Sequence, residues 1–193
     1  EWRPNGIYVQ FASQRAPLLA GYYNAGRRDK KFPSKFNEGM VTMLYKKGHR
    51  SEVRNYRPIT LLNSDYKILT RILAKRMLNI VTQFVSKAQI GFVPRTFIAE
   101  ATRLMQMIQL HLDNIDEGGI FIFLDMEKAF DRVSWRYLKK ALKALKFTAP
   151  YMSWIETLYN ERNPPKRRVY ANGAFSSEYS IFLGVAQGCP LSP

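Results

Sequence analysis

The sequence has little that could cross-link the chain or bind zinc. Its 193 residues include one cysteine, Cys189, and two histidines. A single cysteine excludes an intramolecular disulfide framework, and no Cys and His residues have the spacing of a structural zinc site. The sequence also lacks a run of 18 apolar residues, so it predicts no transmembrane helix. No strongly amphipathic basic helix stands alone, so a membrane surface is only the second choice of partner for this basic chain, and no membrane partner is expected. The fold must therefore be stabilised by its own core.

Acidic residues are scarce as well. Lys and Arg number 30 against 15 Asp and Glu, which gives a net charge of +15. The imbalance lies in residues 1–96, with 18 basic and 5 acidic side chains, whereas residues 97–193 have 12 and 10. A strongly basic half favours a polyanionic partner, most commonly nucleic acid, although solubilising surface charge is the plain alternative. With 46% apolar and 13% aromatic residues, the chain is not a disordered basic tail.

Hydrophobic periodicity and turn residues predict a mixture of helices and strands. Ser134 is an expected helix N-cap, and Asn172–Gly173 is a strong hairpin turn. In the helix at 97–115, Leu104, Met107, Ile108 and Leu112 are expected to point inward. The expected helices cover 7–26, 66–84, 97–115, 135–147 and 150–161, and the expected strands cover 40–45, 59–62, 120–125, 167–172 and 178–184.

A carboxylate follows the most apolar segment directly. Residues 120–124 are all apolar, which is typical of a strand buried on both faces, and Asp125 comes next. A carboxylate at such a position is costly unless it is paired or binds a cation. Glu127 and Asp131 lie nearby, and clustered carboxylate oxygens beside basic residues suit Mg²⁺ and a phosphate substrate. For Asp131, capping of the following helix is the competing interpretation.

Four motifs occur in a characteristic order. They are YKKGHRSEVRNYRPITLLNSDYKILTRIL (45–73), QIGFVPR (89–95), FLDMEKAFDRVSW (123–135) and GVAQGCPLSP (184–193). Together they resemble the reverse transcriptases of non-LTR (LINE-type) retrotransposons, over nearly the whole chain. Group II intron maturase-like enzymes have the same order of motifs, but the residues of the first and third motifs are closer to those of the LINE type.

The resemblance implies an α+β right-hand polymerase fold with mostly helical fingers and an incomplete palm sheet. Residues 1–96 would form the fingers and residues 97–193 the palm. The implied activity is RNA-directed DNA synthesis, with an RNA template, a DNA primer and dNTP as partners. An intracellular location, in the nucleus or the cytoplasm, is what the family leads us to expect.

The resemblance also assigns roles to residues. Asp125 matches a catalytic metal ligand, and the main-chain carbonyl of Met126 would bind the same Mg²⁺ ion of a two-metal site. Lys46 and Arg57 match residues that hold the triphosphate, with a solvated loop charge as the competing interpretation for each.

Three further residues match the nucleotide site. Phe130 matches the bulky residue that selects dNTP over rNTP, with a plain core aromatic as the alternative. Gln187 and Gly188 match the loop that packs on the nucleotide.

Gln89 and Arg95 match a motif that lines the template path. Two residues depart from the family pattern: Ala186, before Gln187, stands where the family usually has Arg, and Pro94, before Arg95, stands where it usually has Gly.

The family's second carboxylate motif is expected beyond residue 193. We therefore expect the chain to be part of a longer protein and, by itself, not to extend a primer; a primer-extension assay with RNA template, Mg²⁺ and dNTPs checks this. Two other functions stay open: a non-catalytic RNA-binding remnant, or an intron maturase-like protein.

Overall fold

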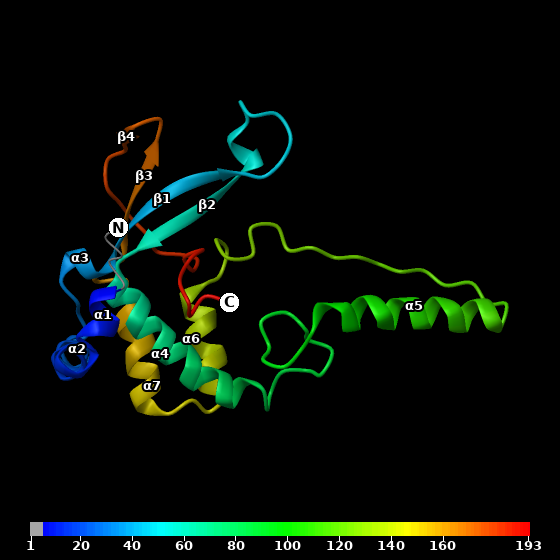
Figure 1. Ribbon diagram of the computed structural model, residues 1–193, viewed down its shortest axis with the longest axis horizontal. Coiled ribbons are helices and arrows are strands. Elements are labelled where there is room, and N and C mark those ends of the chain that lie inside the picture. The colour runs from blue at the N-terminus through cyan, green and yellow to red at the C-terminus, as the bar shows by residue number, and fades with distance from the viewer. Residues whose placement is uncertain (1–5) are drawn as a thin grey trace. The chain divides into compact units, whose positions relative to one another are not determined.

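The computed structural model describes residues 6–193, except the side chain of Ile7, and the chain divides into two units. The first unit comprises residues up to 73 together with 128–192, and the second comprises residues 74–127 with Pro193. The chain contains both helices and strands (Figure 1), which confirms the predicted mixture. The elements are α1 (Gly6–Gln10), α2 (Ala12–Arg28), α3 (Ser34–Asn37), β1 (Glu38–Tyr45), η1 (Val53–Asn55), β2 (Tyr56–Leu62), α4 (Ser64–Val81), α5 (Ile98–Asn114), α6 (Trp135–Ala144), α7 (Ala149–Leu158), β3 (Lys166–Ala171), β4 (Ala174–Phe175) and β5 (Tyr179–Ser180).

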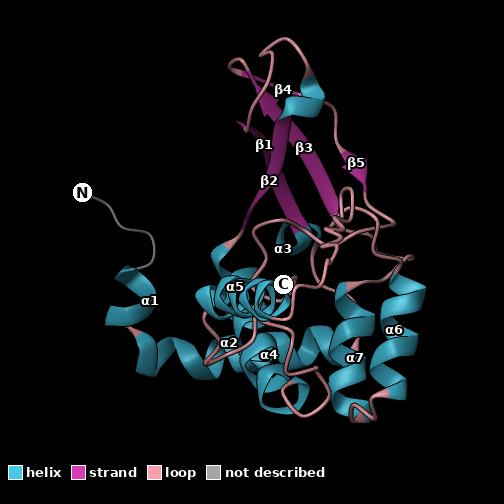
Figure 2. Ribbon diagram, turned by 90° about the vertical axis from the view of Figure 1, so that its right-hand side faces the viewer, coloured by secondary structure: helices cyan, strands magenta, loops and turns pink. Residues whose placement is uncertain are grey.

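The first unit contains a mixed sheet with the strand order β2-β1-β3-β4, and β5 also pairs with β3 (Figure 2). β1 runs antiparallel to β2, with Gly39 opposite Leu62, and parallel to β3, with Gly39 opposite Arg167. The predicted hairpin turn is confirmed: Ala171 pairs with Ala174 across Asn172 and Gly173, which have φ angles of 50° and 81°. Positive φ at both positions is what a type I′ turn requires. The strand that returns from this turn is β4, and the strand expected at 178–184 is reduced to β5.

The core of this unit is rich in aromatic rings. Phe32 and Phe36 stack with their ring centroids 4.1 Å apart, and Tyr66 of α4 lies 5.5 Å from Phe36. All three side chains are buried. The Tyr23 hydroxyl donates to the main-chain oxygen of Asp65 at 2.9 Å, which joins α2 to the start of α4. The aromatic core thus ties the helices to the segment that leads into β1.

Helix α6 begins where the sequence predicted. The Ser134 hydroxyl accepts a hydrogen bond from the Tyr137 N–H, so Ser134 is the N-cap and the alternative that Asp131 caps this helix is wrong. Trp135 and Leu142 are buried, whereas Lys143 is exposed. Helices α6 and α7 contact each other, and α7 contributes the fully buried side chains of Ile155 and Leu158 to the core.

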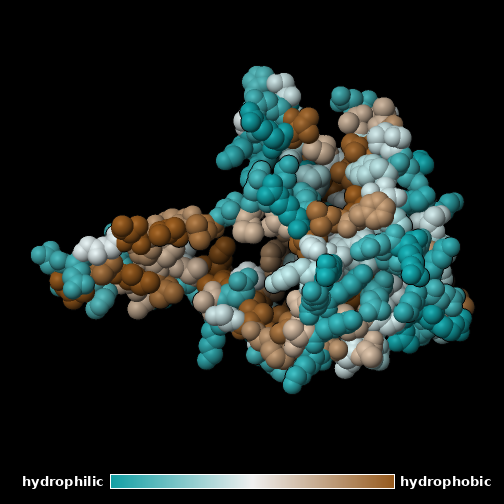
Figure 3. Space-filling model, turned by 180° about the vertical axis from the view of Figure 1, so that it is seen from behind, coloured by the Kyte–Doolittle hydropathy of each residue, from teal (hydrophilic) through white to brown (hydrophobic). Residues whose placement is uncertain are grey.

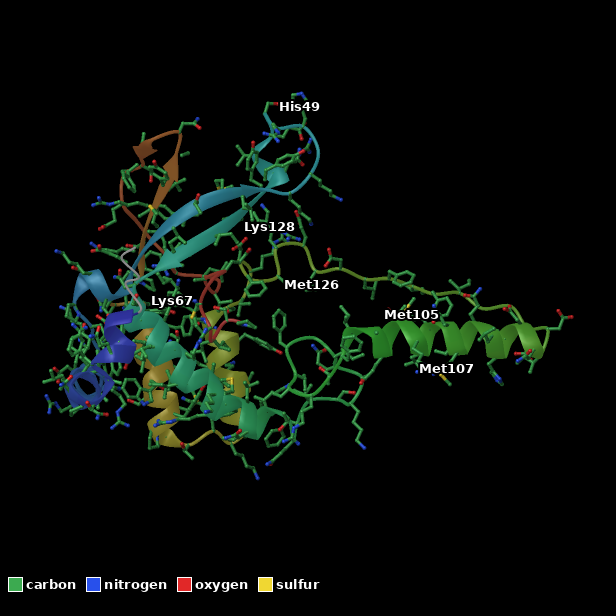
Figure 4. The ribbon with its side chains drawn as sticks, in the orientation of Figure 1. His49, Lys67, Met105, Met107, Met126 and Lys128 are labelled. Carbon is green, nitrogen blue, oxygen red and sulfur yellow. The ribbon has the colours of Figure 1, made fainter. Side chains whose placement is uncertain are left out.

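The second unit departs from the sequence prediction. Helix α5 forms, but it buries no residue, and Leu104, Met107 and Ile108 are exposed instead of inward-facing. Figure 3 shows apolar side chains gathered on the surface of the second unit, and Figure 4 shows Met105 and Met107 projecting from α5. Within the described residues of this unit there is no second layer for the apolar face of α5 to pack on.

The strand predicted at 120–125 is also absent. These residues are extended but unpaired, and Leu124 is 92% exposed. A strand needs a neighbour for its backbone N–H and C=O groups, and the described part of this unit contains no other strand. The apolar composition indicates that these residues tend to be buried, but it does not provide a second strand with which they could pair. No helix within residues 6–193 is long and apolar enough to span a bilayer.

Candidate nucleotide and nucleic-acid site

The loop that contains Gln187 and Gly188 lies along the outer edge of β2. The Thr60 N–H donates to the Gln187 main-chain oxygen at 2.8 Å, on the side of β2 that faces away from β1. Pro58, two residues before Thr60, directs its nitrogen to the same side, so its missing N–H removes no bond of the sheet. Residues 184–189 therefore lie where an additional strand would lie, beside β2, which carries Arg57.

The same loop is also bonded to the segment that carries Phe130. The Val185 N–H donates to the Phe130 main-chain oxygen at 2.8 Å, and the Gly184 N–H donates to the Val133 oxygen at 2.8 Å. The indole N–H of Trp135 donates to the Gly184 oxygen at 2.7 Å. Three segments that are far apart in the sequence are thereby fixed to one another.

Two positions of this loop strongly favour glycine. Gly184 and Gly188 have φ angles of +82° and +115°, a region that side chains disfavour. A Cβ atom at Gly184 would lie 2.7 Å from the Asp131 main-chain oxygen, and one at Gly188 would lie 2.6 Å from the Thr60 oxygen. The close approach of the loop to its two neighbours depends on these glycines.

Lys46 and Arg57 lie at the same end of the β1–β2 pair. Arg57 is opposite Leu44, and the Lys46 N–H donates to the Asn55 oxygen at 2.9 Å. Both side chains are exposed, and neither forms an ion pair with a carboxylate of the described residues. Each cation is therefore available to an anionic ligand.

The first unit thus links the backbone segments that carry Arg57, Phe130, Gln187 and Gly188. Phe130 is half-buried, with its backbone bonded to the loop. Gln187 is half-buried as well, and Gly188 is exposed at the surface. A shared framework of β2, the 184–189 loop and the segment before α6 positions these residues.

The second unit carries the other predicted site residues. Asp125 and Met126 lie in the extended segment after α5 and are exposed, Met126 by 79% (Figure 4). No three Asp, Glu, His or Cys side chains of residues 6–193 come close enough to form a metal cluster. The Asp125 carboxylate and the Met126 carbonyl offer hard oxygen donors, which is the chemistry that divalent cations such as Mg²⁺ prefer.

Gln89 and Arg95 border one hollow of about 530 Å³ within the second unit. The Gln89 side-chain amide donates to the Gly91 oxygen at 3.1 Å. The Thr96 hydroxyl lies 2.6 Å from the Ile90 oxygen and 2.7 Å from the Val93 oxygen, which closes the loop on itself. Arg95 has φ of +67°, an uncommon conformation for a side chain that is not glycine.

Comparison with known proteins shows the family to which the chain belongs. The model of the family described as reverse transcriptase (RNA-dependent DNA polymerase) matches residues 44–193. The chain therefore belongs to the reverse transcriptase family, whose members generally use divalent metal ions and act on nucleic acid templates and nucleotides.

Curated relatives come from mobile elements. The chain is 31% identical over 179 residues to the probable RNA-directed DNA polymerase from transposon BS of Drosophila melanogaster, covering 91% of this chain and 19% of that protein. It is 30% identical over 185 residues to the RNA-directed DNA polymerase from mobile element jockey of the same species, covering 93% and 20%. It is 29% identical over 160 residues to the transposon TX1 uncharacterized 149 kDa protein of Xenopus laevis, covering 83% and 12%. The chain thus spans a fifth or less of the length of these relatives.

Sequence reasoning did not single out Arg167, Trp135 or Thr60 as parts of this framework. Trp135 and Thr60 act through a ring N–H and a backbone N–H, for which the sequence carries no signal. Arg167 is 6% exposed. The alternation of β3 separates Arg167 from Arg168, but only the pairing with Gly39 shows which of the two faces inward.

Proposed function

We propose that the chain forms part of an RNA-directed DNA polymerase of a retroelement, which copies an RNA template into DNA. The observation that carries the proposal is the bonding of the Gln187–Gly188 loop both to β2, which bears Arg57, and to Phe130. The family membership and the names of the transposon relatives support it. The right-hand arrangement, with residues 1–96 as fingers and 97–193 as palm, belongs to the same proposal.

The nucleotide would be held by residues of the first unit. The exposed ammonium of Lys46 and the guanidinium of Arg57 suit triphosphate oxygens, since Arg forms paired hydrogen bonds and Lys acts as a point charge. The Phe130 ring would meet a ribose 2′-OH and so select dNTP over rNTP. Gln187 and Gly188 would pack on the nucleotide, and Gly188 lets the backbone approach closely.

Asp125 and the Met126 main-chain carbonyl would hold Mg²⁺. The Asp125 carboxylate has no hydrogen bond or ion pair with the described residues, so its oxygens are available. Bound Mg²⁺ ions supply charge stabilisation for the primer 3′-oxygen and the pyrophosphate leaving group in a two-metal site. The protein's own part is to orient the carboxylate and the carbonyl toward that position.

The template would follow the hollow bordered by Gln89 and Arg95. Arg95 can bind a phosphate of the RNA, and the Gln89 amide can bind a base edge or a sugar. The basic excess of residues 1–96 suits the RNA template and the DNA primer, since phosphate contacts supply most of the affinity for nucleic acid.

The proposal is tested by substitution of Arg57 in an active polymerase. The aligned segment of the jockey polymerase is replaced by this chain, and primer extension on an RNA template is measured against dNTP concentration. Arg57→Gln is expected to raise the KM for dNTP by about 10- to 100-fold, because a charge-assisted hydrogen bond contributes about 1.5–3 kcal/mol.

Arg54→Gln is the matched control. Arg54 is exposed on the same hairpin, where its Nε bonds to Glu52 Oε2 at 2.7 Å, and its substitution removes the same charge. It should leave the KM for dNTP near that of the parent. Equal effects of the two substitutions would contradict a nucleotide-binding role, and RNA binding without any extension would favour the non-catalytic RNA-binding function.

A further inference from the structure

A buried arginine lies at the centre of the sheet of the first unit. Arg167 of β3 pairs with Gly39 of β1 and is 6% exposed. A Cβ atom at Gly39 would lie 3.2 Å from Arg167 Cδ and 2.8 Å from Thr60 Cγ2. The absence of a side chain at Gly39 therefore leaves the space in which the Arg167 side chain crosses β1 toward β2.

The Arg167 guanidinium is only partly satisfied by the protein. Its Nη1 atom donates to the Asn37 main-chain oxygen at 2.6 Å and to the Lys166 oxygen at 2.8 Å. Guanidinium has five N–H donors, so these two bonds on one nitrogen leave others to be satisfied. No carboxylate of the described residues lies within ion-pair distance of Arg167. A buried cation without a counter-charge is costly.

The same guanidinium borders a cavity of about 310 Å³. Other walls come from Tyr66, Tyr159, Tyr179 and Gln187. Burial raises the pKa of both Tyr66 and Tyr159 above the ordinary tyrosine value, so these phenols stay protonated near neutral pH. They are neutral hydrogen-bond donors and cannot neutralise Arg167.

Asp131 is the one carboxylate among the residues that border this cavity. Its side chain is exposed and does not form an ion pair with Arg167. The wall around Arg167 therefore presents a fork-shaped cation, phenolic hydroxyls and a side-chain amide. Several donors around one space match a group with more acceptor oxygens than a carboxylate has, and phosphate is such a group.

We propose that this cavity is a binding site for a phosphate group, with Arg167 as its main ligand. The phosphate would supply the missing negative charge. Its oxygens would accept hydrogen bonds from the remaining guanidinium N–H groups in a bidentate arrangement and from the phenols. The proposal rests on the contacts of Arg167 and not on the polymerase activity proposed above, although Gln187 borders this cavity and also belongs to the proposed nucleotide site.

Thermal unfolding of the chain tests this proposal, with inorganic phosphate as the probe and KCl of equal ionic strength as the reference. At a hundredfold excess over Kd, phosphate is expected to raise the Tm by about 5–10 °C. The Arg167→Met variant keeps the length of the side chain but removes the charge, and it should lose the phosphate response. A parallel titration with dAMP separates the two sources of the group: stabilisation at lower concentration than phosphate assigns the site to nucleotides, and weaker stabilisation assigns it to free phosphate.

Arg168→Met is the matched control. Arg168 is the next residue of β3, its side chain is 58% exposed, and its Nη2 lies 3.7 Å from Glu178 Oε2, so its loss removes one surface charge. This variant should respond to phosphate as the parent does. If Arg167→Met does not fold, Arg167→Lys replaces it, with an expected loss of about tenfold in phosphate affinity, since Lys lacks the bidentate fork. A phosphate response equal to that of KCl, or equal in the Arg167 and Arg168 variants, overturns the proposal.

Discussion

Asp125→Asn is expected to lower DNA synthesis by about a hundredfold or more in a polymerase that carries this segment, because the amide loses the charge that holds a divalent cation. Asn keeps the shape of the side chain, and Asp125 is exposed, so the substitution should not disturb folding. The effect should appear in kcat for nucleotide addition, with little change in RNA affinity. Primer extension under single-turnover conditions, together with RNA binding measured separately, gives both quantities.

Asp113→Asn provides the control for this experiment. Asp113 lies in the last turn of α5, in the same unit as Asp125, and it is exposed as well. Its substitution removes the same charge and should leave synthesis unchanged. A polymerase that keeps its kcat after Asp125→Asn would show that this carboxylate is not a metal ligand, whatever the other residues do.

The elements of the first unit were largely predictable from the sequence because their signals are local. Ser134 caps α6, Asn172–Gly173 forms the hairpin turn, and helical periodicity places α4. Each depends on residues within a few positions of one another, so propensity and periodicity are sufficient. Some elements differ: the structure breaks the single helix predicted at 7–26 at Phe11 into α1 and α2, and the strand predicted at 178–184 is reduced to β5. The short elements α3 and β4 were not predicted.

The second unit shows where local signals stop being informative. The apolar run at 120–124 and the apolar face of α5 predict burial, yet both are exposed in this unit. A segment becomes buried only where a second segment packs against it, and the sequence of the first segment does not specify the second. Asp125 was singled out by its position after that run, so its environment depends on a strand that is absent here.

The sequence predicted which residues belong to the candidate site, but it did not predict the hydrogen bonds that join the segments carrying them. Gln187 and Arg57 come from separate motifs, and nothing in either motif states that the loop bonds to β2 at Thr60. Such a bond joins backbone atoms, for which residue types carry almost no information. The buried position of Arg167 depends likewise on the register of β1 and β3, a long-range property.

The glycines of the 184–189 loop allow this backbone bonding, so their substitution is expected to lower the stability of the chain. Gly184→Ala is expected to lower the free energy of unfolding by about 2–5 kcal/mol, from about 1–2 kcal/mol of left-handed strain and about 1–3 kcal/mol of overpacking. The strain follows from φ of +82°, and the overpacking follows from a Cβ atom only 2.7 Å from the Asp131 oxygen. That oxygen belongs to the backbone, which cannot move aside as a flexible side chain would. Urea denaturation of the chain measures the change.

Gly173→Ala separates the two contributions. Gly173 has nearly the same φ, +81°, but no atom lies within 4 Å of a Cβ placed there. This variant should therefore lose only the strain, about 1–2 kcal/mol. The difference between the two variants measures how closely residue 184 approaches the segment before α6, and two equal losses would mean that the loop is not packed there. Because the Gly184 main-chain groups also bond to Val133 and Trp135, a loosened loop should displace Gln187 as well and weaken dNTP binding in the polymerase that carries the segment.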